Sequence, residues 1–327
     1  LGTSVKSIAF GEGNPFQNLK SLESIQIDPN NTAYESSINN ISYNAVFKKD
    51  KYSELLAGCK GTSTIPDDVT KIGDYAFAGT DIANVKLGSN ITQIGDYAFY
   101  KCDSLVGVEC QGKLTRIGAH AFDGTKIESF PFESSSKSLK TIGASAFANN
   151  ENFNGAKIPD SVTAVGENPF EGTAWYTNTK NSLTNTNPFY VVDNWIVAVD
   201  TALSNGGNYT LSGYKGIADY GLKSSTLKTL TIPENVQYIG LGILRGCKEI
   251  TKLDAYFLGE TKNDKSNATL GYLFGDTLNT GSMTSASLTD VTIRTGNLNV
   301  GAFDGTSVAV LDLGNTKMVK GLLTNVT

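Results

Sequence analysis

The hydrophobic pattern of this chain repeats, and the copies within uninterrupted stretches begin 22 to 25 residues apart. The repeated phrase has the form Ile-Gly-x-x-Ala-Phe. Strong copies begin at Ile72, Ile94, Ile117 and Ile142, and weaker copies begin at Val165, Ile217, Ile239 and Leu298. A fixed period of about 20 to 50 residues is characteristic of repeat architectures. The pattern therefore predicts a stack of similar coils.

Each repeat contains two short segments that are typical of strands. The first has the form apolar-x-x-apolar-x-apolar, as in Ile82–Leu87 and Leu227–Ile232, and its last three positions alternate as a half-buried strand does. The second precedes the Ile-Gly pair, as in Val69–Ile72 and Ile91–Ile94, and keeps its two middle positions polar. Each coil is thus predicted to carry two strands and a short helical turn.

The repeated phenylalanine and glycine positions predict how the coils pack. One coil cannot bury its own apolar residues, whereas stacked coils share a continuous core. We expect the phenylalanines to form an aromatic ladder in that core, namely Phe77, Phe99, Phe122, Phe147, Phe170 and Phe303. We expect a backbone bend that only glycine tolerates at Gly73, Gly95, Gly118, Gly143, Gly166 and Gly240.

These features together predict a leucine-rich-repeat solenoid, mainly β with short helical turns. About nine coils would form a right-handed superhelix. We expect a single domain over residues 1–327. Because both ends read as interrupted coils and solenoids need polar caps, we expect either a longer parent protein or caps formed by the terminal segments.

The period is interrupted near residues 28–64, 174–210 and 255–287. The first interruption has apolar segments at 42–47 and 53–56, and the second has them at 189–192 and 195–198. Both interruptions are typical of β-hairpins. The third, which surrounds the phrase Leu-Gly-Tyr-Leu-Phe-Gly at residues 270–275, is expected to be a loop or a small excursion.

Two groups of aromatic residues are candidates for ligand binding. The second interruption is rich in aromatic side chains, which form either a stacking surface for a sugar or peptide or the hairpin's own small core. Its candidates are Trp175, Tyr176, Tyr190 and Trp195. The second group is Tyr75, Tyr97 and His120, which occupy the same position in three consecutive coils. This column is predicted to stack, either as a stripe that holds an extended ligand or as a ladder that stabilises itself.

Composition excludes several other functions. The net charge is −5 with no cluster of lysine and arginine, which argues against nucleic-acid binding. A single histidine leaves almost no material for a His-based catalytic or metal site, so we expect no cofactor, no metal and no enzymatic activity. The four cysteines have no Cys-x-x-Cys spacing and read as small buried hydrophobic residues. No run of 18 apolar residues predicts a membrane span.

The repeat resembles the BspA-like bacterial leucine-rich repeats. The resemblance rests on the Ile-Gly-x-x-Ala-Phe phrase, on the preceding Ile-Pro-x-x-Val-Thr-x-Ile segment at 65–72, and on the Gly-Thr or Gly-Cys pairs that follow, such as Gly79-Thr80 and Gly246-Cys247. The inserted segment at 44–51 is similar to a hairpin of that family, and the segment at 270–275 to a recurring interruption.

The resemblance implies a secreted or surface-displayed protein of a host-associated bacterium, since some members are adhesins that bind host extracellular proteins. The family motif consists of structural residues, so it assigns no binding or catalytic residue. We therefore expect a non-enzymatic surface protein that binds a host or neighbouring-cell protein or glycan. The alternative is a structural spacer that displays other domains and has no ligand of its own.

Overall fold

The computed structural model describes residues 1–9, 13–38, 41–49, 51–275 and 284–314. These residues form two compact units, each built from solenoid coils with little helix. Unit 1 comprises Leu1–Val162 and Pro169–Asn178, and unit 2 comprises Thr163–Asn168 and Thr179–Thr327. The leucine-rich-repeat solenoid is thus confirmed in each unit, while a single domain over the whole chain stays a prediction.

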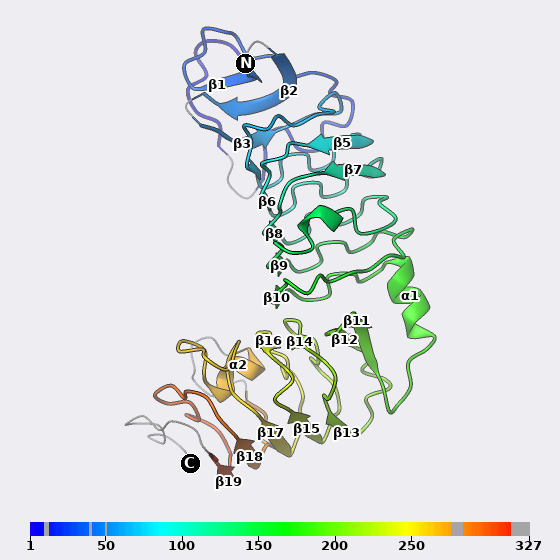
Figure 1. Cartoon of the computed structure of the whole chain (residues 1–327), viewed down its shortest axis with the longest axis vertical. Helices are drawn as coiled ribbons and strands as arrows, with labels where there is room; N and C mark the ends of the chain where they lie inside the picture. The colour runs from blue at the N-terminus through cyan, green and yellow to red at the C-terminus, as the bar shows by residue number, and fades with distance from the viewer. Residues whose placement is uncertain (10–12, 39–40, 50, 276–283, 315–327) are drawn as a thin grey trace. The chain divides into compact units, whose positions relative to one another are not determined.

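The short strands before each Ile-Gly pair form a parallel column in unit 1 (Figure 1). They are β4 (Lys71–Ile72), β6 (Gln93–Ile94), β8 (Arg116–Ile117) and β9 (Thr141–Ile142). Each isoleucine lies opposite the isoleucine of the next coil and is fully buried. One apolar row therefore runs through the stack, as the repeat predicts.

The first strands of the coils also pair in parallel. In unit 1 these are β5 (Asn84–Leu87) and β7 (Gly107–Cys110). In unit 2 they are β13 (Asn208–Thr210), β15 (Thr229–Ile232), β17 (Lys252–Ala255), β18 (Asp290–Ile293) and β19 (Val310–Asp312). Burial alternates along β5, β15, β17 and β18, which confirms the half-buried strand predicted from the sequence.

The two predicted hairpins are present, and each replaces the short strand of a coil. The first consists of β2 (Ile41–Lys48) and β3 (Lys51–Ala57), preceded by an unpredicted antiparallel strand, β1 (Tyr34–Ile38). The second consists of β11 (Phe189–Val192) and β12 (Trp195–Val199).

The second strand of each hairpin continues in parallel into the next coil. β3 pairs with β4, where Leu55 lies opposite Ile72. β12 pairs with β14 (Gly216–Ile217), where Ile196 lies opposite Ile217, and β14 pairs with β16 (Tyr238–Ile239). Leu55 and Ile196 are fully buried, so the hairpins contribute to the core of the solenoid.

The third interruption is not a loop or an excursion at its centre. Residues Leu270–Phe274 form the short helix α2, and all five are buried. The amide of Leu244 donates to the carbonyl of Leu273, and the amide of Leu270 donates to the carbonyl of Ala302. α2 therefore takes the place of the helical turn in a coil. Residues 276–283 of this interruption lie outside the described residues.

The predicted phenylalanine ladder is present in unit 1. The rings of Phe77, Phe99, Phe122, Phe147 and Phe170 stack with centroid distances of 4.9, 5.1, 5.6 and 5.6 Å. All five are buried, and Phe303 is buried in unit 2. Stacked aromatic pairs stabilise a core beyond the area they bury, so the ladder joins each coil to the next.

The repeated glycines serve close packing and not a backbone bend. None of the described glycines at this position has a positive φ. A Cβ on Gly118 would instead lie 2.5 Å from the carbonyl carbon and oxygen of Gly95 in the preceding coil. The amide of Gly118 donates to the carbonyl of Ile94 at 2.9 Å. Glycine is therefore required here because two backbones meet, which corrects the expectation of a bend.

A column of buried polar residues follows the phenylalanines. Its members are Thr80, Cys102, Thr125, Asn150 and Thr173 in unit 1 and Ser225, Cys247 and Thr306 in unit 2. Asn150 Nδ2 donates to the carbonyls of Phe122, Phe147 and Ala148, and its Oδ1 accepts from Thr125 Oγ1. This column satisfies carbonyl groups that no strand reaches.

Two cysteines belong to this polar column. Cys102 Sγ donates to the carbonyl of Phe77 at 3.0 Å, and Cys247 Sγ donates to that of Leu222 at 3.2 Å. Burial raises the pKa of the Cys102 thiol to about 11. None of the four cysteines, which all lie in the described part of the chain, forms a disulfide, and three are buried while Cys110 is partly exposed. The reading as small buried residues holds for those three, although two also act as hydrogen-bond donors.

Replacing Gly118 by alanine is expected to lower the free energy of unfolding by about 1–3 kcal/mol, because the added methyl group meets backbone that cannot rotate away. Urea denaturation followed by circular dichroism measures this loss. The matched control is Gly2→Ala, where a Cβ would meet nothing within 4 Å. Equal stability of the two variants would contradict the close-packing explanation.

Replacing Asn150 by alanine is expected to lower the free energy of unfolding by about 2–3 kcal/mol, since the buried carbonyl of Phe147 loses its Asn150 donor. The carbonyls of Phe122 and Ala148 each lose one donor and keep another, from Thr125 and Gly124 respectively. The same denaturation measurement applies. The exposed strand residue Asn84 provides the control, and Asn84→Ala should change stability by less than about 0.5 kcal/mol. If Asn150→Ala behaved like this control, the polar column would not be structural.

Candidate binding site

The predicted column of Tyr75, Tyr97 and His120 is present in unit 1 as a parallel stack. The rings of Tyr75 and Tyr97 lie 4.7 Å apart at 2°, and those of Tyr97 and His120 lie 4.6 Å apart at 10°. All three side chains are half-buried. We call these three residues the aromatic column.

The backbone of the aromatic column is left-handed. The φ angles of Tyr75, Tyr97 and His120 are 57°, 57° and 52°. This conformation costs an L-residue with a bulky side chain about 1–2 kcal/mol. The same position is also left-handed at Ser145, Asn168, Tyr220, Gly242 and Gly301. The coil itself requires this backbone conformation. Tyrosine adopts it at a higher conformational free energy than glycine does.

The stack leaves ring edges, not ring faces, available around Tyr97. Tyr75 covers one face of the Tyr97 ring and His120 covers the other. Tyr100 packs its ring against Tyr97 at 5.3 Å and 83°, and the Lys101 ammonium group lies 5.0 Å from the centroid of Tyr100. Stacking of this kind offsets part of the backbone strain, at about 0.5–1.5 kcal/mol for each aromatic pair.

The single histidine is held by a neighbouring carboxylate that the sequence analysis did not identify. His120 Nδ1 lies 2.7 Å from Asp123 Oδ2, and Asn149 Nδ2 donates to Asp123 Oδ1 at 2.8 Å. Asp123 is buried. The spacing of three residues between His120 and Asp123 was the available signal, because such residues are neighbours on one turn. The pair fixes the orientation of the imidazole at the end of the column.

Two aspartates of the repeat connect successive coils. Asp74 Oδ1 accepts from the amide of Asp96 at 3.0 Å, and Asp96 Oδ1 accepts from the amide of Ala119 at 2.8 Å. Arg116 Nη2 also donates to Asp96 Oδ1 at 2.6 Å. The repetition of Ile-Gly-Asp in two consecutive coils was the signal for this arrangement, since a residue repeated outside the core needs its own explanation.

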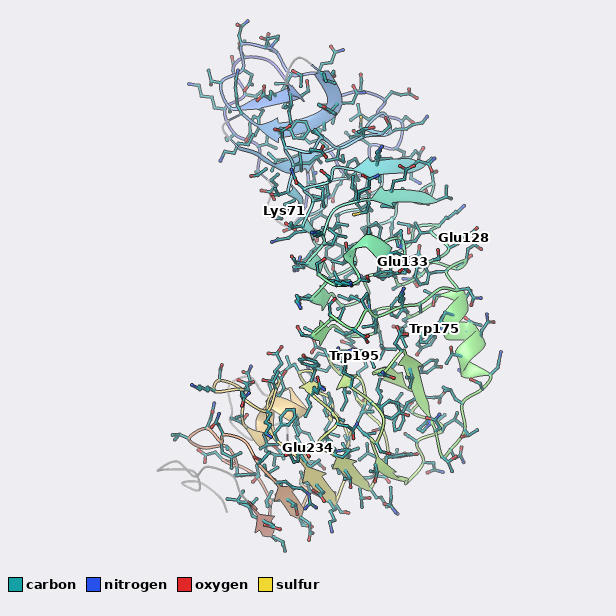
Figure 2. The ribbon with its side chains drawn as sticks, viewed as in Figure 1. Lys71, Glu128, Glu133, Trp175, Trp195 and Glu234 are labelled. Carbon is teal, nitrogen blue, oxygen red and sulfur yellow. The ribbon has the colours of Figure 1, made fainter. Side chains whose placement is uncertain are left out.

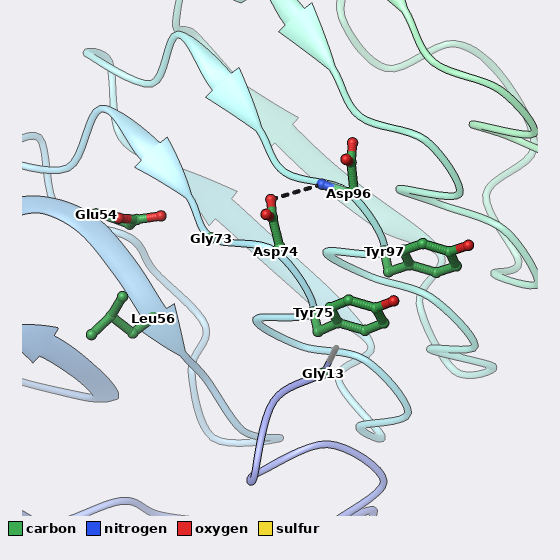
Figure 3. A pocket seen from close by; sticks show the side chains of 8 residues that line it. All are labelled: Gly13, Glu54, Leu56, Gly73, Asp74, Tyr75, Asp96 and Tyr97. Atoms are coloured by element: carbon green, nitrogen blue, oxygen red, sulfur yellow. Dashed lines mark hydrogen bonds between the residues drawn. The ribbon is translucent and has the colours of Figure 1, made fainter. Parts of the chain in front are cut away.

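A pocket of about 380 Å³ lies beside the aromatic column. Figure 3 shows Glu54 and Leu56 of β3 on one side of it and Asp74, Tyr75, Asp96 and Tyr97 on the other. Gly13 and Gly73 complete the lining. The pairing of β3 with β4 places Glu54 opposite Lys71, which binds its carboxylate at 2.7 Å. The pocket therefore combines two aromatic rings, one leucine and three carboxylates.

Trp175 and Tyr176 lie on the helix α1 (Ala174–Lys180), where Figure 2 labels Trp175. Both are half-buried. The Trp175 ring packs against Phe170 at 5.7 Å and 68°, and its amide donates to the carbonyl of Phe153. Trp175 therefore covers the last ring of the phenylalanine ladder in unit 1. Whether the exposed parts of these two residues bind a ligand stays a prediction.

Tyr190 and Trp195 belong to the core of unit 2, so the hairpin-core reading applies to them. Each is 2% exposed, and the ring of Trp195, which Figure 2 labels, stacks on Tyr238 at 5.8 Å and 10°. Trp195 also lines a cavity of about 30 Å³ with Asp219 and Tyr272. A ligand needs exposed ring surface to stack on, and neither side chain offers it in this fold.

The described residues contain no group of three or more histidine, cysteine, aspartate or glutamate side chains placed to hold a metal ion. In the same part of the chain, no helix is long and apolar enough to cross a membrane. The pocket and the aromatic column of unit 1 form the candidate site, because they combine exposed carboxylates with half-buried aromatic rings.

Comparisons with known proteins agree with the repeat. The sequence matches the model of the BspA type leucine rich repeat region in six copies, over residues 49–177 and 209–262. A comparison with curated protein sequences finds no match.

Several solved structures align with this chain at low similarity. A leucine-rich repeat protein from Bacteroides ovatus is 16% identical with a TM-score of 0.34, and the alignment covers 89% of this chain and 91% of that one. A leucine-rich repeat protein from Eubacterium ventriosum is 18% identical with a TM-score of 0.32, covering 86% and 83%. A leucine rich cell surface protein from Faecalibacterium prausnitzii is 16% identical with a TM-score of 0.25, covering 90% and 96%.

The family match carries the assignment. It extends over more than half of the chain and includes the four strong copies of the repeat, whose strands, glycines and phenylalanines form the core described above. The chain belongs to the BspA-type leucine-rich-repeat family.

Proposed function

We propose that this chain is a non-enzymatic, secreted or surface-displayed protein that binds a protein or glycan of a host or neighbouring cell. The observation that carries the proposal is the half-buried aromatic column in left-handed backbone beside the pocket. The resemblance to bacterial adhesins supports the surface or extracellular setting.

The aromatic column supports binding because the coil does not need it. Gly242 and Gly301 hold the same left-handed conformation in unit 2 without strain. Tyr75 and Tyr97 hold it at a cost, and strained residues of this kind cluster at functional sites. Tyrosine is also enriched at binding interfaces, where its ring and its hydroxyl both make contacts.

The non-enzymatic part of the proposal rests on how the polar groups are used. His120 is engaged by Asp123, and the Asp96 carboxylate binds Arg116 and a backbone amide. The bonds of Asp96 connect two coils, and the bond between His120 and Asp123 holds a side chain within one coil. Both are structural uses.

A structural spacer is the second candidate, and one observation favours it. Both faces of the Tyr97 ring are covered by its neighbours in the column. A column that satisfies itself stabilises the stack of coils without any ligand. The two functions differ in whether the isolated chain binds a target.

Replacing Tyr97 by asparagine is expected to weaken binding at least tenfold while leaving the fold intact. Asparagine adopts left-handed backbone more readily than tyrosine, so relief of strain offsets part of the lost stacking. Binding is measured on immobilised extracellular-matrix proteins and host glycans at two salt concentrations, and folding is checked by circular dichroism.

The matched control is Tyr220→Asn, since Tyr220 has the same φ of 57° at the equivalent position in unit 2. Loss of binding in the Tyr97 variant alone supports the proposed site. Equal binding by both variants and the parent chain would place the site elsewhere. A folded parent chain that binds no target on the panel would favour the spacer.

A further inference from the structure

We propose that the pocket beside the aromatic column takes an arginine side chain from an extended segment of a protein ligand. This inference rests on the proposed binding function and names the chemistry of the ligand. It selects a protein over a glycan, and a planar cation over other groups.

The charge of the pocket is the first argument. Its lining includes three carboxylates, those of Glu54, Asp74 and Asp96, and none of its described lining residues is a lysine or arginine. Glu54 binds Lys71 at 2.7 Å and Asp96 binds Arg116 at 2.6 Å. Among the described residues, Asp74 forms no ion pair; its carboxylate accepts from the amide of Asp96, and its charge also interacts with that of Lys71. Three carboxylates against the two cations Lys71 and Arg116 leave one negative charge in excess, which matches one cationic side chain.

The shape and surface of the pocket are the second argument. Its volume of about 380 Å³ falls within the range of sites that bind small molecules, so it has room for one long side chain. The half-buried Leu56 offers apolar surface to a methylene chain, and the glycines Gly13 and Gly73 leave the lining open. A long side chain with a polar end fits such a lining, because its stem packs on apolar surface while its head reaches the carboxylates.

The carboxylates of the pocket distinguish arginine from lysine. A guanidinium group is planar and donates two parallel hydrogen bonds to a carboxylate. Asp74 provides such a carboxylate in the lining, beside Tyr75 and Tyr97. A lysine ammonium group is a compact, strongly hydrated charge that gains less from this arrangement.

The same geometry disfavours a glycan. Sugars bind aromatic side chains by lying on their ring faces, and both faces of Tyr97 are already covered. The exposed carboxylates still offer acceptors to hydroxyl groups, so a glycan is an outcome that the experiment must separate.

The test is a titration of the ¹⁵N-labelled full chain, followed by amide chemical shifts. The probes are acetyl-Gly-Arg-Gly-amide, its lysine and citrulline counterparts, and a β-1,4-linked glucose tetrasaccharide. We expect the arginine peptide to shift the amides of Gly13, Gly73 and Asp74 and to bind more tightly than the other probes. Added salt should weaken this binding, because the charges are partly exposed.

The variant pair is Asp74→Asn and Asp68→Asn. Asparagine at position 74 keeps an oxygen for the Asp96 amide and removes the charge, and we expect about tenfold weaker binding of the arginine peptide. Asp68 is exposed and lies outside the lining, so its variant should bind like the parent chain.

Citrulline binding as tight as arginine, no shift with the arginine peptide, or no effect of Asp74→Asn would each overturn the inference. Shifts of the same amides by the tetrasaccharide alone would replace it with glycan binding. The panel of matrix proteins and glycans is scored separately. If the chain binds a panel target but does not bind the arginine peptide, this inference is rejected and the proposed function stands. If the chain binds the arginine peptide but no panel target, the pocket takes arginine and the proposed host or neighbouring-cell target is not supported.

Discussion

Contact between the backbones of successive coils is the constraint on which the rest of the structure depends. The amides of Gly95, Gly118 and Gly143 each donate to an isoleucine carbonyl of the preceding coil at 2.9 Å. A side chain at these positions would collide with the neighbouring backbone. Once this spacing is set, the buried isoleucines, the phenylalanine rings and the polar column come into register without further adjustment.

Most of the fold is legible in the sequence because it follows from repetition. The period predicts two strands per coil and the phenylalanine ladder, and the apolar segments of the interruptions predict both hairpins. The ladder and the hairpins are present. The two strands are present in some coils, while in unit 1 the coils after β8 (Arg116–Ile117) have only the isolated bridge between Ser129 and Gly155 in place of a first strand. The reason for the glycines could not be read, since a repeated glycine signals either a special φ or a close contact. The helix α2 (Leu270–Phe274) was also missed. Its apolar segment lacks the repeat motif, so the sequence does not show that it replaces the helical turn of a coil.

The candidate site was predictable only where it repeats. The stacking of Tyr75 on Tyr97 follows from their equal places in consecutive coils. Glu54 comes from a hairpin strand, and only its register with β4 (Lys71–Ile72) brings it to the pocket. Trp195 was proposed as a ligand-binding residue but is buried. The sequence of a hairpin does not show whether an aromatic side chain is exposed or buried.

The left-handed position in each coil has a consequence for how such surfaces diversify. Tyrosine, histidine, serine, asparagine and glycine all occupy it in this one chain, while its backbone conformation stays constant. The conformation belongs to the coil, and the side chain is interchangeable. Neighbouring positions recur at the pitch of the stack, about 4.8 Å. The solenoid thus offers side-chain positions at a fixed spacing. A substitution at one of them changes the surface of a single coil and leaves the backbone of the stack unchanged.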